Sequence, residues 1–162
     1  MTRHARKMFL LLAITSLVVS AAVRTSNAAS NQDVALGHLV YLGFQDIDFN
    51  ARSSAFGTDA RGHFRATVTG FDPNQVYEGE VLCLQVVGTD TAALATIGGV
   101  ITRAPAGNTA QGFVAFASDS GKFSQGADTF DWTITALPTT VCPTPALGTP
   151  VVDGEIVIRD AH

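Results

Sequence analysis

The chain has 162 residues, 46% of them hydrophobic and 15% charged, and its 14 acidic residues outnumber its 10 lysines and arginines. A length of this order suits one domain with its own core. The net charge of −4 argues against a nucleic-acid-binding protein, because such proteins need a basic surface to displace counterions from phosphates.

The N-terminal segment has the pattern of a secretory signal peptide. A basic stretch precedes the apolar run 8–23, and small residues at Ser26 and Ala28 favour cleavage after Ala28. We therefore expect residues 1–28 to be a signal peptide and the product to be secreted or periplasmic, with no integral membrane segment after cleavage. The mature chain then keeps 6 basic residues against 14 acidic ones, a net charge of 6 − 14 = −8, having lost Arg3, Arg6, Lys7 and Arg24.

After a polar leader, residues 29–35, we expect residues 36–162 to form a single β domain. Apolar and polar side chains alternate, as in half-buried strands, in three segments: 46–52, 63–69 and 129–136. Further strands are expected at 37–44, 76–87, 91–102, 112–118 and 154–160. No segment has a sustained helical period. The pattern predicts an all-β fold, a single antiparallel barrel-like or sandwich domain of about 7–9 strands.

Within this domain, segment 79–103 predicts a β-hairpin with its turn at 88–90. The first strand is expected to turn one row of side chains to one side: Leu82, Leu84 and Val86. The Gly98–Gly99 pair is no phosphate-binding loop, because no Lys-Ser/Thr follows it and no helix opens there. A bulge or a close approach of two backbones is the better interpretation.

The segment 137–153 contains four prolines, so neither a helix nor a central strand is expected there. It contains Cys142, and the other cysteine, Cys83, lies in an expected strand. Two cysteines in an exported chain most simply form a disulfide. A Cys83–Cys142 bond would attach the proline-rich segment to the sheet.

Metal-binding patterns are incomplete, and we expect neither a metal nor a cofactor. Segment 46–50 imitates the start of a calcium loop but lacks the glycine and the glutamate that complete one. Segment 119–122, with Asp128 nearby, can offer loop oxygens to a cation, although a polar turn is the simpler interpretation. The histidines of the mature chain lack metal-ligand spacing; they are His38, His63 and His162.

Two further kinds of site are open. Glu78 and Glu80 share one strand face and, with Asp131, are the carboxylates that a hydrolase would use, although no G-x-S-x-G elbow is present. If the sheet closes into a barrel, aromatic side chains can line an apolar ligand cavity; otherwise they fill the core. The possible lining residues are Phe49, Phe64, Phe113, Phe130 and Trp132.

Several motifs resemble a loose group of small exported bacterial proteins of unknown function. They are "GEVLCLQVVGTDTAALATIGGVIT", which has the pattern G-x-V-x-C-L-x-V followed by A-x-I-G-G-x-I, then "FASDSG", "DTFDWTIT" and a closing "GEIVI". The resemblance runs from Phe49 to Ile158. It implies an all-β exported domain and transfers no catalytic residue.

The expected function is that of a secreted, non-enzymatic β domain, a binding or cell-surface-associated module whose target the residues do not name. One alternative is a small β-barrel that binds an apolar ligand. A second is an extracellular hydrolase.

Overall fold

The computed structural model describes residues 31–55, 57–89, 92–121 and 127–161. The signal peptide predicted at 1–28 and the C-terminal His162 lie outside these ranges. The described residues form nine strands and no helix. The strands are β1 Gln32–Tyr41, β2 Gln45–Ser54, β3 Arg61–Val68, β4 Gln75–Thr89, β5 Ala92–Arg103, β6 Gly112–Asp119, β7 Thr129–Thr135, β8 Thr149–Pro150 and β9 Asp153–Arg159.

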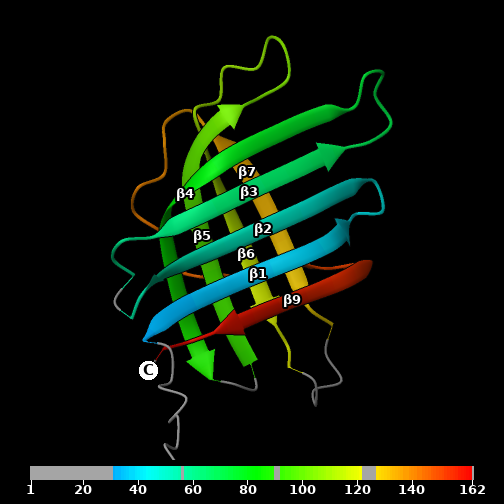
Figure 1. The fold of residues 1–162 in the computed structure, drawn as a ribbon. Helices are drawn as coiled ribbons and strands as arrows, with labels where there is room; N and C mark the ends of the chain where they lie inside the picture. The colour runs from blue at the N-terminus through cyan, green and yellow to red at the C-terminus, as the bar shows by residue number, and fades with distance from the viewer. Residues whose placement is uncertain (1–30, 56, 90–91, 122–126, 162) are drawn as a thin grey trace, which may run out of the picture.

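All nine strands belong to one antiparallel sheet in the order β8-β7-β6-β5-β4-β3-β2-β1-β9. The sheet curls into a half-barrel, in which β9, β1, β2 and β3 form one layer and β5, β6 and β7 cross behind them (Figure 1). The 15-residue strand β4 belongs to both layers. The predicted all-β fold, a single antiparallel barrel-like domain, is confirmed.

The core lies between the two layers and is built from alternate side chains. Ile47, Phe49 and Ala51 of β2 are buried, as the alternation predicts. Phe64 of β3 stacks on Phe113 of β6, with ring centroids 4.6 Å apart, so aromatic rings join the front layer to the back one. Such pairs stabilise a fold beyond their buried area by about 0.5–1.5 kcal/mol each.

Strand β1 begins at Gln32, inside the segment that the sequence marks as a polar leader. It pairs with β2 as far as Ser54, which keeps the hairpin regular to its end. Asp33 is buried there, but its carboxylate accepts hydrogen bonds from Ser53 Oγ at 3.4 Å and from the Ala161 amide at 3.0 Å. A polar residue can therefore extend the strand, because its buried oxygens have partners.

The predicted hairpin is present as β4 and β5, with two register shifts, the first between Glu78 and Gly79. The second shift lies between Val81 and Cys83, opposite Gly98 and Gly99, so the predicted bulge is confirmed. The bulge makes the prediction for Leu82 wrong: its side chain is 39% exposed, while Leu84 and Val86 are buried. A Cβ on Gly99 would collide with the Glu80 carbonyl oxygen, which is why the backbones can approach only at glycine.

Residues 137–148 form a strap across the outer side of the back layer. The Cys83–Cys142 disulfide joins it to β4, as predicted, with the two Cα atoms 5.6 Å apart. The Thr139 amide donates to the Gly99 carbonyl at 3.1 Å, and the Thr139 side chain lies against Gly98. The strap ends at the two-residue strand β8, which pairs with β7. The sequence did not predict this strand, because the segment is rich in proline.

Candidate binding face

The strand register aligns charged and imidazole side chains in one row across the outer side of the front layer. Each residue of this charged row lies directly opposite the next one on the neighbouring strand. Acidic residues alternate with basic or imidazole residues along it, in the order Glu155, His38, Asp48, Arg65, Glu78 and Arg103. Cross-strand neighbours of opposite charge favour this register.

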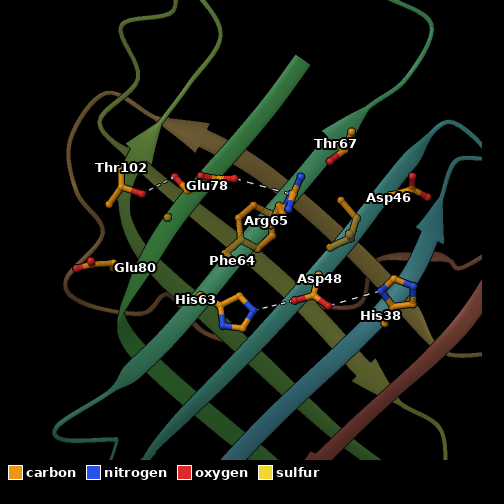
Figure 2. Close-up of a pocket in the computed structure, with 12 residues that line it drawn as sticks. His38, Asp46, Asp48, His63, Phe64, Arg65, Thr67, Glu78, Glu80 and Thr102 are labelled. Atoms are coloured by element: carbon orange, nitrogen blue, oxygen red, sulfur yellow. Dashed lines mark hydrogen bonds and ion pairs between the residues drawn. The ribbon is translucent and has the colours of Figure 1, made fainter. Parts of the chain in front are cut away.

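Two carboxylates organise the contacts of the charged row (Figure 2). Asp48 lies between two imidazoles, with Oδ1 2.8 Å from His63 Nε2 and Oδ2 3.6 Å from His38 Nδ1. Glu78 Oε1 lies 3.9 Å from Arg65 Nε and 3.6 Å from Arg103 Nη1. Exposed pairs of this kind contribute only about 0–1 kcal/mol each, so they orient the side chains more than they stabilise the fold.

The charged row crosses an open hollow of about 790 Å³ on the outer side of β1–β4. This volume is within the range of about 300–1,000 Å³ typical of ligand sites, and most of the residues that line the hollow have polar or charged side chains. Four carboxylates line the hollow against a single guanidinium, that of Arg65. The four are Asp46, Asp48, Glu78 and Glu80. We call this surface the acidic hollow.

The structure brings some predicted site residues together and separates others. Glu78 and Glu80 both line the acidic hollow, together with His38 and His63. Asp131 lies elsewhere, on β7, where its Oδ1 accepts hydrogen bonds from Tyr41 Oη at 3.1 Å and from the Trp132 amide at 2.8 Å. The three carboxylates named for a hydrolase therefore do not form one group.

The sequence did not predict the contacts of Asp48 with His38 and His63. Alternation alone indicates that Asp48 and His63 point outward, since both lie on polar strand faces. Their contact depends on the register of β2 against β3, which places His63 opposite Asn50 and diagonal to Asp48. The spacing along one strand carries no information about that register.

Of the five aromatic residues named as possible cavity lining, the four phenylalanines lie in the core and Trp132 is partly buried against it. Phe49 stacks on Phe130 with ring centroids 5.6 Å apart, and Phe64 contacts both Phe113 and Trp132. Trp132 also donates a hydrogen bond from Nε1 to Gln45 Oε1 at 2.7 Å. These rings pack against one another, as the core-filling alternative requires; a ligand cavity among them stays a prediction.

The carboxylates of the predicted polar turn after β6 accept hydrogen bonds from backbone amides of β9. Asp119 Oδ2 accepts from the Ile158 amide and Asp128 Oδ2 from the Ile156 amide, both at 3.0 Å. Lys122 of the same turn lies outside the described ranges. Across the described residues, no three histidine, cysteine or acidic side chains form a group that could hold a metal ion.

In the described part of the chain, no helix has the length and apolar character needed to cross a membrane. Comparison with protein-family models, with curated proteins and with solved structures finds no match for this chain.

Proposed function

We propose that this chain is a secreted, non-enzymatic β domain that acts as a binding or cell-surface-associated module, and that the acidic hollow is its binding face. The observation that carries the proposal is the open hollow on β1–β4, whose lining contains four carboxylates and one guanidinium. The Cys83–Cys142 disulfide supports export, since disulfides persist in oxidising compartments.

The charge of the hollow indicates the class of partner. With neutral imidazoles, its lining carries four negative charges and one positive charge. Arg65 offsets one of these negative charges, and Arg103, which lies beside Glu78, offsets a second one. The remaining carboxylates favour a cationic, hydrogen-bonding partner, such as a basic peptide segment, over an anionic or apolar one.

Glu78 differs from the other carboxylates because it is held between two guanidinium groups. Asp46 and Glu80 have no ion pair among the described residues, so their oxygens are open to an incoming cation. They lie on β2 and β4, on either side of β3. A partner that meets both must cross β3 at Arg65 or Thr67, the residues between them in the hollow.

A peptide titration followed by NMR tests this proposal. Tetralysine is added to ¹⁵N-labelled mature protein at low ionic strength, and tetraserine is added to a matched sample as the uncharged control. We expect saturable shifts of amides on β2, β3 and β4 with tetralysine only, and their loss at high salt. Shifts spread over the whole domain, or equal shifts with tetraserine, would contradict the proposal.

A further inference from the structure

A second row of the same outer face has the opposite charge. Arg159 of β9 lies opposite Val34, Val34 lies opposite Arg52, and Arg52 lies opposite Arg61 of β3. We call the three basic residues the arginine row. They are three of the five arginines in the described part of the chain, in a mature protein whose acidic residues outnumber basic ones by more than two to one. Basic charge is therefore concentrated at one end of β9, β2 and β3.

The Arg52–Arg61 pair has no compensation of the kind found along the charged row. Like charges directly opposite each other on neighbouring strands destabilise a sheet. In the charged row, Arg65 and Arg103 share the Glu78 carboxylate. No ion pair joins Arg52 or Arg61 to a carboxylate among the described residues. The two guanidinium groups thus repel each other without a counter-charge in contact.

Polar residues share a hollow with this pair. Arg52 and Arg61 line a hollow of about 230 Å³ at the end of β2 and β3. Asn31, Gln32, Ser53 and Ser54 line the same hollow, with Asp59 as its one carboxylate. Two guanidinium groups against one carboxylate leave a net positive charge. A space of this volume suits a compact ligand rather than a polymer.

We propose that Arg52 and Arg61 form a binding site for a small oxyanion, a phosphate or a sulfate group, that bridges their guanidinium groups. Planar guanidinium groups hold such oxygens in pairs, which a lysine ammonium cannot do. The site is separate from the acidic hollow and does not depend on its function. A net charge of −8 on the mature chain repels extended polyanions, so the ligand is a free anion rather than a charged membrane or nucleic acid.

The test uses inorganic phosphate and inorganic sulfate, with the mature full-length protein. The Nε–Hε signals of the arginines are followed by NMR at constant ionic strength, with chloride replacing the oxyanion in the reference titration. We expect saturable shifts of Arg52 and Arg61, and a dissociation constant of about 1 mM, a value common for a small exposed site. Shifts that match those in chloride would overturn the proposal.

Substitutions separate a built site from general charge attraction. Arg52→Gln and Arg61→Gln should each weaken phosphate binding about tenfold or more, while Arg52→Lys keeps the charge and should lose part of the affinity because it loses the paired donors. Arg103→Gln removes the same charge from the same face and should leave the affinity unchanged. An equal loss in Arg103→Gln would show that only net charge matters and would overturn the proposal.

Stability gives a second readout that does not depend on detecting the ligand. In phosphate-free buffer, Arg52→Gln should melt at a higher temperature than the parent protein, because the repulsion between opposite guanidinium groups is relieved. Phosphate should then raise the melting temperature of the parent protein and not that of the variant. Binding to phosphatidylglycerol vesicles without binding to inorganic phosphate would assign the surface to a membrane and refute the small-anion site.

Discussion

Tyr41 shows how one residue links the two layers of the half-barrel. It lies at the end of β1, and its phenol donates to Asp131 of β7 at 3.1 Å. Burial raises the pKa of this phenol above its ordinary value, the negative charge of Asp131 raises it further, and a hydrogen bond with Thr149 acts in the opposite direction. The contact therefore favours the protonated phenol.

The raised pKa predicts a loss of stability in alkali. Because the folded state holds the proton more tightly than the unfolded state, this contribution is complete below about pH 10, the ordinary value for tyrosine, and is lost as the pH rises through the folded pKa. Tyr41→Phe should cost about 1 kcal/mol at neutral pH and should flatten the alkaline part of the stability curve.

Urea unfolding measured at a series of pH values from about 8 to 11 checks this prediction. Asp131→Asn is the companion variant, since it keeps the phenol and removes the neighbouring charge. It should reduce the alkaline loss without abolishing it. Parallel stability curves for the parent protein and Tyr41→Phe would show that this phenol does not contribute to the pH dependence.

At the scale of elements, β9 is the last strand of the sheet, and its outer edge would leave amides unpaired. Asp119 and Asp128 meet two of these amides, those of Ile158 and Ile156. Both carboxylates lie next to strands of the back layer, β6 and β7. Side chains, rather than a tenth strand, therefore join the open edge of the half-barrel to its other layer.

Removing either carboxylate should loosen this edge locally. Asp119→Ala should speed hydrogen exchange at the Ile158 amide, and Asp128→Ala should do so at Ile156, with a cost of about 1–3 kcal/mol each for a lost charged acceptor. Asp46→Ala, on the exposed side of β2, is the control and should leave both amides protected. If each variant affected the two amides equally, the one-to-one assignment would be wrong.

The elements also show what the sequence can predict. Eight of the nine strands were expected from the sequence. Alternation marks a strand such as β2, which has one buried and one more exposed face, whereas β6 is buried on both faces and has an apolar sequence. Alternation missed β8, since proline removes the ladder donor on which a strand prediction rests. It also misplaced Leu82, because a bulge reverses the alternation without leaving a mark in the spacing. The uses of Asp119 and Asp128 depend on contacts with β9, more than 25 residues away.

At the scale of the whole molecule, the outer face of the front layer carries two patches of opposite charge. The acidic hollow lies over the middle of β1–β4, and the arginine row lies at the end of β2 and β3. Net charge predicted an acidic protein but not this separation, because the register of four strands decides which charges share a row. The chain could thus be assigned a fold from its sequence, whereas its candidate sites needed the pairing of strands.

The central claim is that the acidic hollow, rather than the acidity of the whole protein, binds a cationic partner. The most direct test compares two double variants that lose the same charge. Asp46→Asn with Glu80→Gln changes the hollow, while Asp59→Asn with Asp72→Asn changes two exposed acidic residues that belong neither to the hollow nor to the charged row. Tetralysine affinity is measured for both by calorimetry at one ionic strength.

The account predicts that the hollow variant binds tetralysine about 5- to 30-fold more weakly than the parent protein, since each exposed charge pair is worth about 0.5–1 kcal/mol. The outer variant should bind within about twofold of the parent protein, because neither of its two side chains lines the hollow and salt weakens the attraction between exposed charges that are not in contact. Equal weakening in the two variants would contradict the account, since it would assign the attraction to net charge alone.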